Sequence, residues 1–164
     1  RRVASIVEQQ VGGDELIVVS AAGKTTNRLI QLVELAEAGD EAAGEAISAL
    51  QAYQQSLIDG LLEGELQLDL SKQLADDMQL IAKTLEGQFD RFARNGLLAF
   101  GEVWSARLMS AVLNQQGLSA AWLDAREFLR AERAAQPQVD EGLSYPLLHC
   151  IPRQTSGGDR VYQP

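Results

Sequence analysis

The chain has 164 residues, of which 46% are hydrophobic and 23% are charged, and its formal net charge is −9. This length and composition are typical of one globular domain with a sizeable core. The negative charge disfavours a broad nucleic-acid surface or an anionic membrane as the main partner, and the apolar runs are shorter than the ~20 residues of a membrane span. We therefore expect no nucleic-acid partner and no membrane partner.

The cysteine content and the first residues favour a cytoplasmic location. One cysteine cannot form an internal disulfide, which suits a reducing compartment. The first eight residues, Arg-Arg-Val-Ala-Ser-Ile-Val-Glu, lack the apolar core of a signal peptide. Because the chain does not begin with methionine, we expect its natural N-terminus to lie upstream.

Helical patterns fill most of the first hundred residues, with one short strand among them. Val3, Ile6 and Val7 are spaced for one face of a helix, and an apolar, β-branched run predicts a strand over residues 16–19. Further helices are predicted from about 28 to 39, 41 to 60, 66 to 85 and 88 to 98, the last with a break near Gly96. Plain core packing is the simplest explanation of their apolar stripes.

The second half predicts another helix and another strand. A helix is predicted over residues 101–113, and Gly117 is expected to end it. A buried strand is predicted over residues 120–125, with Asp124 near its end. Two strands joined by helices predict an α/β fold, with a parallel sheet and a large helical excursion between these strands. Ser20 and Asp124 would then lie at the carboxyl edge of the sheet. After Phe128 the pattern weakens, and residues 136–138 are typical of a loop.

The turn after the first strand is the first candidate site. Gly23-Lys24-Thr25 is similar to part of a phosphate-binding P-loop, but that motif needs glycine at position 18, where the chain has valine. The hydroxyls of Ser20 and Thr26 and the small residues between them still allow a ligand to approach the backbone. The structural alternative is a helix N-cap with a tight turn.

The other polar candidates also have structural explanations. Glu102 opens its helix, where an acid either complements the helix dipole or receives the ammonium group of a substrate. Asp124 and Arg126 fit an exposed ion pair at a strand end. His149 has no partner at ligand spacing apart from Cys150, so the sequence predicts no metal site and no catalytic triad.

Two blocks of sequence resemble aspartate kinases of the amino-acid kinase family. Residues 19–27, Val-Ser-Ala-Ala-Gly-Lys-Thr-Thr-Asn, resemble the second conserved block of these kinases. Residues 101–110, Gly-Glu-Val-Trp-Ser-Ala-Arg-Leu-Met-Ser, resemble their Gly-Glu-x-x-Ser helix, and residues 122–126 are similar to the strand that follows it. Residues 101–148 are similar to the kinase half of bifunctional aspartokinase/homoserine dehydrogenases of type II.

The resemblance implies a partial amino-acid-kinase fold and ATP-dependent phosphorylation of the side-chain carboxylate of L-aspartate. This reaction gives aspartyl phosphate, the entry to lysine, threonine and methionine synthesis. By motif position Thr26 and Glu102 would bind aspartate, with Glu102 facing its α-ammonium group, and Ser20, Ala21 and Gly23 would line the space near the phosphoryl group. ATP, Mg²⁺, an NADP-dependent dehydrogenase half and a homo-oligomer are implied for the complete enzyme. A non-catalytic helical α/β interaction or regulatory module is the alternative.

Parts of the family pattern have no counterpart in the chain. The family's first strand ends in Lys-Phe-Gly-Gly-Ser, whose lysine holds phosphate, and its later half carries the nucleotide pocket. We therefore interpret residues 1–148 as the N-terminal part of a kinase catalytic domain, with no catalytic residue of its own and no ATP turnover alone. After residue 148 the family continues toward a buried strand similar to Lys-Arg-Leu-Val-Val-Thr-Gly-Phe-Ile-Ser. When the possible codons of residues 153–164 are read one nucleotide later, they can encode Ala-Lys-Arg-Leu-Val-Val-Thr-Gly-Phe-Ile-Ser. Residues 149–164 are thus expected to be an out-of-frame, poorly packed tail.

Overall fold

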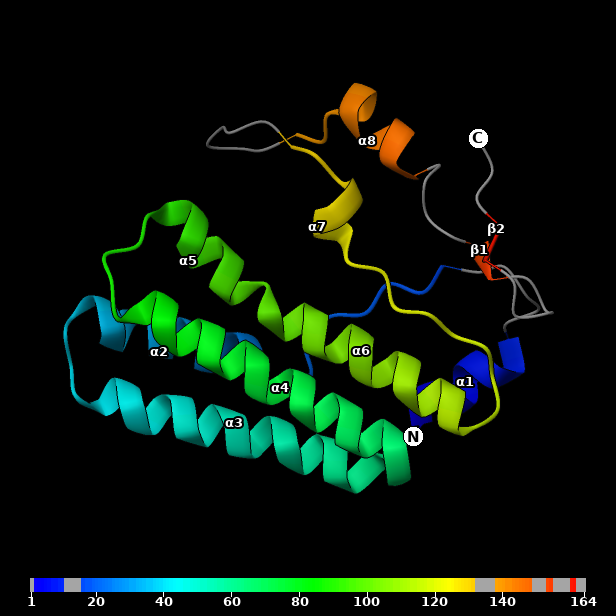
Figure 1. Cartoon of the computed structure of the whole chain (residues 1–164), viewed down its shortest axis with the longest axis horizontal. Coiled ribbons are helices and arrows are strands. Elements are labelled where there is room, and N and C mark those ends of the chain that lie inside the picture. Colours follow the sequence, from blue (N-terminus) through cyan, green and yellow to red (C-terminus); the bar gives the residue numbers. More distant parts are fainter. Residues whose placement is uncertain (1, 11–15, 132–137, 149–152, 155–159, 162–164) are drawn as a thin grey trace. The chain divides into compact units, whose positions relative to one another are not determined.

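The computed structural model describes residues 2–10, 16–131, 138–148, 153–154 and 160–161 (Figure 1). The chain divides into two compact units, Arg1–Ala120 and Ala121–Pro164. The elements of the described residues are α1 (Arg2–Gln10), α2 (Thr25–Glu37), α3 (Ala42–Leu61), α4 (Gly64–Leu85), α5 (Arg91–Leu98), α6 (Phe100–Gln115), α7 (Ala125–Phe128), α8 (Glu141–Leu148), β1 (Arg153–Gln154) and β2 (Arg160–Val161).

Helices α3 and α4 form a long hairpin whose inner faces follow the helical repeat. Leu50 and Ile58 of α3 are buried, as are Leu74 and Met78 of α4, and each pair is spaced for one face. The chain turns sharply between the two helices, where Gly64 has a φ of 65° that glycine adopts without strain. The predicted helices over 41–60 and 66–85 are therefore confirmed, with boundaries shifted by one or two residues.

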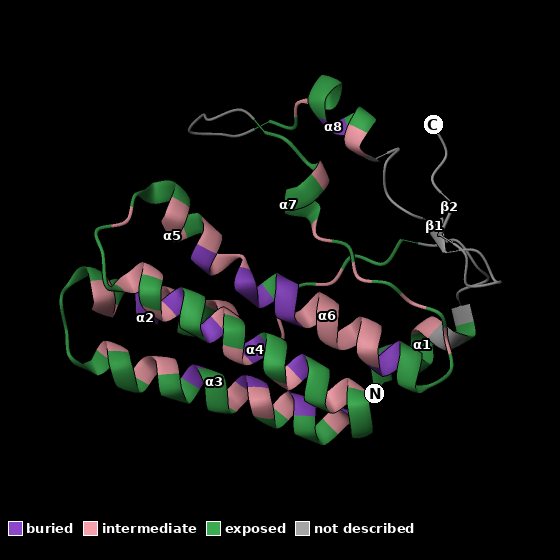
Figure 2. Ribbon diagram, in the orientation of Figure 1, coloured by how far each residue is buried: buried purple, intermediate pink, exposed green. Residues whose placement is uncertain are grey.

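Helix α6 is the central helix of the first unit, since it contacts α1, α2, α3, α4 and α5. Its N-terminal half buries Phe100 and Trp104, whose ring centroids lie 5.5 Å apart, and its C-terminal half buries Val112. Figure 2 shows the buried residues along the helix. At its end, Gln115 donates to the Leu61 carbonyl and accepts from the Glu63 backbone N–H, which ties α6 to the α3–α4 connection.

The parallel sheet is not formed in the part of the chain that the structure describes. Residues 16–22 and 118–124 have no regular secondary structure, and α7 begins at Ala125 with Asp124 as its N-cap. The side chains of Leu16 and Val18 are 74% and 89% exposed. A strand needs a hydrogen-bonded neighbour, and neither segment has one among the described residues. The two strands expected at 16–19 and 120–125 are thus absent from the described structure, and the sheet is not confirmed.

Glycine residues mark the ends of α2 and α6, whereas a glycine within α5 does not interrupt that helix. Gly39 and Gly117 follow α2 and α6 with φ values of 66° and 86°, so both predicted stops are confirmed. The break predicted near Gly96 is wrong, because α5 continues through this residue to Leu98. Asp90 fixes the start of α5 by accepting from two backbone N–H groups, which outweighs the low helix propensity of one glycine.

The second unit holds α7, α8 and the antiparallel pair β1–β2. The Ser144 hydroxyl of α8 accepts from the Arg130 backbone N–H, and Ala131 forms an antiparallel bridge with Val139. Helix α8 was not predicted, since the apolar pattern is weak and Pro146 lies inside it. His149, Cys150 and most of the expected loop at 136–138 lie outside the described residues.

One helical stretch of the described residues, Arg91–Gln115, is long and apolar enough to cross a membrane by length and composition. A single stretch of this kind is weak evidence, because the core helix of a globular protein meets the same criteria. Leu97, Trp104 and Val112 within it are buried in the first unit, and core packing accounts for its apolar face.

Candidate functional site

The Thr25 turn, defined as residues 20–26, connects the irregular segment that begins at residue 16 to helix α2. Gly23 has a φ of 57°, which lets the chain reverse before the helix begins. Thr25 is fully buried, and its hydroxyl donates to the Ala22 carbonyl at 2.6 Å. The Thr25 backbone N–H donates to the same carbonyl at 3.2 Å. The turn is therefore closed twice by one residue, once through its backbone and once through its side chain.

Two adjacent side chains of helix α3, Tyr53 and Gln54, contact the Thr25 turn. The buried amide of Gln54 donates from Nε2 to the Thr25 hydroxyl at 2.8 Å. The Tyr53 hydroxyl occupies the place where a β-carbon on Gly23 would stand. The guanidinium of Arg28 lies 4.5 Å from the centroid of the Tyr53 ring, a cation–π geometry. The turn is thus held by residues far away in sequence.

Gly101 brings the start of helix α6 against the same turn. A β-carbon added at Gly101 would lie 3.0 Å from Cβ of Ala21 and 3.4 Å from Cγ2 of Thr25. Carbon atoms are in good contact at about 3.5–4.0 Å, so only glycine permits this approach without displacement. The two segments that resemble aspartate kinases, residues 19–27 and 101–110, are therefore neighbours in space.

The predicted site residues differ in their exposure. Ser20, Gly23 and Glu102 are exposed, while Ala21 and Thr26 are half-buried. Glu102 follows Gly101 in the first turn of α6, so it stands beside the contact between the two segments. The roles of these residues toward a substrate stay predictions.

An ion pair fixes helix α6 against helix α4. One carboxylate oxygen of Asp77 accepts from Trp104 Nε1 at 2.9 Å and from Arg107 Nη1 at 2.6 Å. The side chains of Asp77 and Arg107 are only 13% and 15% exposed, so water screens this interaction weakly. The pair joins α6 to α4 in the half of α6 that also carries Glu102.

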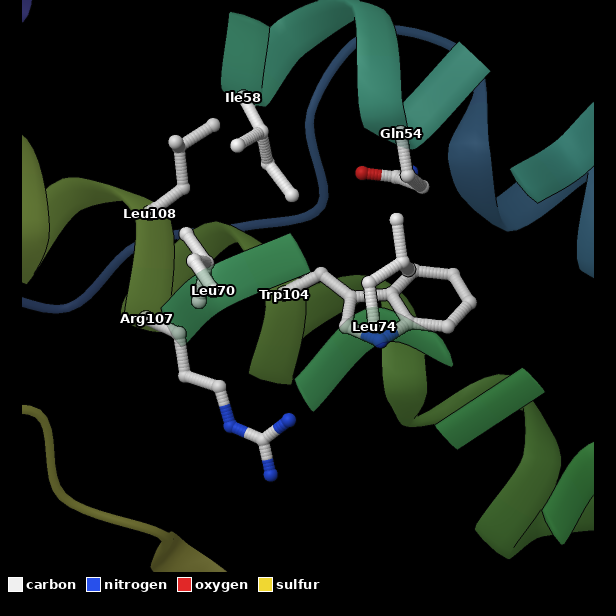
Figure 3. Close-up of a pocket in the computed structure, with 7 residues that line it drawn as sticks. All are labelled: Gln54, Ile58, Leu70, Leu74, Trp104, Arg107 and Leu108. Atoms are coloured by element: carbon white, nitrogen blue, oxygen red, sulfur yellow. The ribbon is translucent and has the colours of Figure 1, made fainter. Parts of the chain in front are cut away.

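A small cavity and an open groove in the first unit lie apart from the predicted site residues. The cavity in Figure 3 has a volume of about 10 Å³, enough for one water molecule at most. An open groove of about 310 Å³ lies between the ends of α2, α3 and α4. The cavity is lined by Gln54, Ile58, Leu70, Leu74, Trp104, Arg107 and Leu108, and the groove by Ala36, Gly39, Asp40, Ala43, Ile47, Ala82, Leu85 and Glu86. Neither hollow is lined by Ser20, Thr26 or Glu102.

The described residues do not form a group of side chains that could hold Mg²⁺ by themselves. Among the described residues no three His, Cys, Asp or Glu side chains are grouped as a metal site, and Mg²⁺ requires such oxygen ligands or the phosphates of a substrate. A β-carbon at Gly23 would collide with the Tyr53 hydroxyl, so the turn accepts only glycine at this position. The Thr25 hydroxyl is buried and already bonded to Ala22 and Gln54, so Ser20 and Thr26 are the hydroxyls of the turn that remain candidates for a ligand.

Gln54 is a contact residue that the helical pattern did not single out. It lies four residues after Leu50 and four before Ile58, so it occupies a buried position of α3. A polar side chain at a core position needs a hydrogen-bond partner, and this mismatch is the signal that identifies it. Its partner, Thr25, cannot be derived from spacing because the contact is between distant segments.

With the turn and the start of α6 in contact, comparison with known proteins assigns the class of protein. The chain belongs to the amino acid kinase family, whose model matches residues 1–158. The match extends past residue 148, and the out-of-frame origin of the tail stays a prediction.

Individual relatives agree with this assignment. The chain is 51% identical over 156 residues, 95% of its length, to bifunctional aspartokinase/homoserine dehydrogenase 2 of Escherichia coli, and covers 19% of that protein. It is 31% identical over 84% of its length to the chloroplastic bifunctional aspartokinase/homoserine dehydrogenase 1 of Arabidopsis thaliana, covering 16% of it. It is 23% identical over 87% of its length to lysine-sensitive aspartokinase 3 of Escherichia coli, covering 32% of it. The chain thus spans less than a third of each of these relatives.

Proposed function

We propose that residues 1–148 are the N-terminal part of an aspartate kinase catalytic domain. The complete enzyme transfers a phosphoryl group from ATP to the side-chain carboxylate of L-aspartate. The observation that carries the proposal is the contact of Gly101 with Ala21 and Thr25, because it joins the two segments that resemble aspartate kinases. Relatives named aspartokinase over most of the chain support it.

Within this proposal Glu102 binds the α-ammonium group of aspartate. Its side chain is exposed in the first turn of α6, where an acidic residue complements the helix dipole. A carboxylate that accepts from an ammonium group forms a charge-assisted hydrogen bond. The hydroxyls of Thr26 and Ser20 bind carboxylate oxygens of the same substrate. Ala21 and Gly23 contribute no side chain that would block the space near the phosphoryl group.

Phosphoryl transfer depends on positioning and on neutralisation of charge more than on covalent chemistry of the protein. This segment supplies positioning of aspartate, and ATP and Mg²⁺ are held by other parts of the complete enzyme. Residues 1–164 alone form no aspartyl phosphate. The names of the relatives support a homoserine dehydrogenase half in the complete protein. Its use of NADP, its cytoplasmic location and its assembly as a homo-oligomer are further parts of this proposal.

The test uses a longer protein that contains this segment in its natural sequence. Aspartyl phosphate is trapped with hydroxylamine, and we expect product that depends on both L-aspartate and ATP. Glu102→Gln should raise KM for aspartate by about tenfold or more, which corresponds to about 1.4 kcal/mol. Glu65→Gln is the matched control, because Glu65 is an exposed acid in the first turn of α4. An active protein with equal KM values in both variants would contradict the role of Glu102, and no product at all would favour the non-catalytic module.

A further inference from the structure

We propose that Gln54 of helix α3 is a positioning residue, which holds the Thr25 turn in the conformation that binds substrate. The inference rests on the proposed function, because the turn carries Ser20 and Thr26. Gln54 touches no substrate in this proposal. It acts through the Thr25 hydroxyl, and the helical hairpin thereby sets the geometry of the turn.

Two hydrogen bonds in series connect helix α3 to the middle of the turn. The Thr25 hydroxyl gives its single proton to the Ala22 carbonyl at 2.6 Å. Its oxygen then accepts from Gln54 Nε2 at 2.8 Å. Because the hydroxyl proton is already used, the partner on α3 must be a donor, and the amide of glutamine meets this requirement. The series therefore has one direction, from Gln54 through Thr25 to Ala22.

The burial of Gln54 indicates a specific purpose for its amide. The side chain is 4% exposed and Thr25 is 0% exposed. Leu50 and Ile58, one turn to either side, show that this face of α3 accepts apolar residues. Burying an amide costs free energy unless it is hydrogen-bonded, so leucine would serve packing at least as well. Leucine, however, cannot donate a hydrogen bond to the Thr25 hydroxyl, whereas Gln54 does.

Adjacent contacts support the same turn. Tyr53, next to Gln54, places its hydroxyl against Gly23, and Arg28 of α2 stacks on the Tyr53 ring at 4.5 Å. Figure 3 shows that Gln54 of α3 and Trp104 of α6 line the same small cavity. The residue thus lies where α3, the turn and the central helix α6 converge, and its loss is expected to release the turn while the helices stay packed.

The first experiment measures steady-state kinetics of a longer protein that contains this segment. Gln54→Leu should raise KM for L-aspartate by about tenfold, the equivalent of one hydrogen bond of about 1.4 kcal/mol, with a smaller change in kcat. Gln55→Leu is the matched control, because the Gln55 amide donates to Asp59 and Ser71 instead of to the Thr25 turn. An unchanged KM in a folded Gln54→Leu protein would overturn the proposal.

Substitutions at the other end of the hydrogen bond keep the test decisive if Gln54→Leu does not fold. Thr25→Val removes the hydroxyl at constant shape and should raise KM for aspartate as Gln54→Leu does. Thr25→Ser keeps the hydroxyl and should lie closer to the natural protein. Combining Gln54→Leu with Thr25→Val should give less than the product of the two single effects, because both variants remove the hydrogen bond from Gln54 to Thr25. Equal effects of Thr25→Val and Thr25→Ser, or independent effects in the double variant, would overturn the proposal.

Hydrogen exchange separates this proposal from the proposed function. In the 164-residue chain, Gln54→Leu should speed amide exchange at residues 20–26 and leave exchange within α4 unchanged, whereas Gln55→Leu should not affect the turn. This readout needs no catalysis. Faster exchange without aspartate-dependent kinetics would contradict the proposed function alone, and unchanged exchange at the turn would contradict the role of Gln54.

Discussion

Replacing Gly101 by alanine tests the contact on which the candidate site depends. Two effects of opposite sign compete. Alanine in a helix is favoured over glycine by about 0.5–1 kcal/mol. Against this gain, the new β-carbon would lie 3.0 Å from Cβ of Ala21 and 3.4 Å from Cγ2 of Thr25, and overpacking of this kind costs about 1–3 kcal/mol. The net result expected for Gly101→Ala is a loss of about 1 kcal/mol in the free energy of unfolding.

Gly44→Ala is the matched control for this substitution. Gly44 lies in the first turn of α3, as Gly101 lies in the first turn of α6, but a β-carbon there meets no atom within 4 Å. Gly44→Ala should therefore stabilise the protein by about 0.5–1 kcal/mol. Urea unfolding followed by circular dichroism measures the free energy of unfolding of both variants, and equal m values make the two directly comparable. The difference between the two variants is the cost of the contact at Gly101. Equal stabilisation by the two substitutions would refute the close approach of α6 to the turn.

Three further substitutions test other interactions of the first unit. Asp77→Ala removes the carboxylate that binds Arg107 and should cost about 2–3 kcal/mol by urea unfolding, whereas the exposed neighbour Asp76→Ala should stay within about 0.5 kcal/mol; equal losses would contradict the role of the pair. Asp90→Ala removes the N-cap of α5 and should cost about 1 kcal/mol, measured in the same way, and a neutral result would contradict the cap. Hydrogen bonds from Gln67 and Gln55 lower the pKa of Asp59, so its contribution to stability is present above the unfolded-state pKa and is lost as the pH falls through the folded-state pKa. Asp59→Asn should therefore reduce the loss of stability between pH 7 and acid, and an unchanged pH dependence would contradict this sign.

The helices could be predicted from sequence because their signals are local. Apolar residues at helical spacing mark α2, α3, α4 and α6, and Gly39 and Gly117 mark two of their ends. The weak apolar pattern of α8 and the proline within it explain why that helix was missed. The expected break at Gly96 failed because the Asp90 cap and the packing of Leu97 outweigh one glycine.

Strands and the site depend on contacts between distant segments, and spacing alone does not predict them. Residues 16–19 have the composition of a strand, yet composition cannot supply the neighbour that a strand requires. The resemblance identified the segments of the turn and of α6, and the structure brings them together at Gly101. It did not identify Thr25 and Gln54, although a glutamine between Leu50 and Ile58 was a detectable sign of a buried hydrogen bond.

Calorimetric titration of L-aspartate tests most directly whether this segment forms the aspartate side of a kinase site. The titration uses a longer, folded protein that contains the segment, together with its Glu102→Ala and Glu65→Ala variants. We predict saturable binding that is lost in Glu102→Ala and retained in Glu65→Ala, because only Glu102 stands beside the contact of α6 with the Thr25 turn. No binding by the natural protein, or equal binding by both variants, would contradict the proposed site.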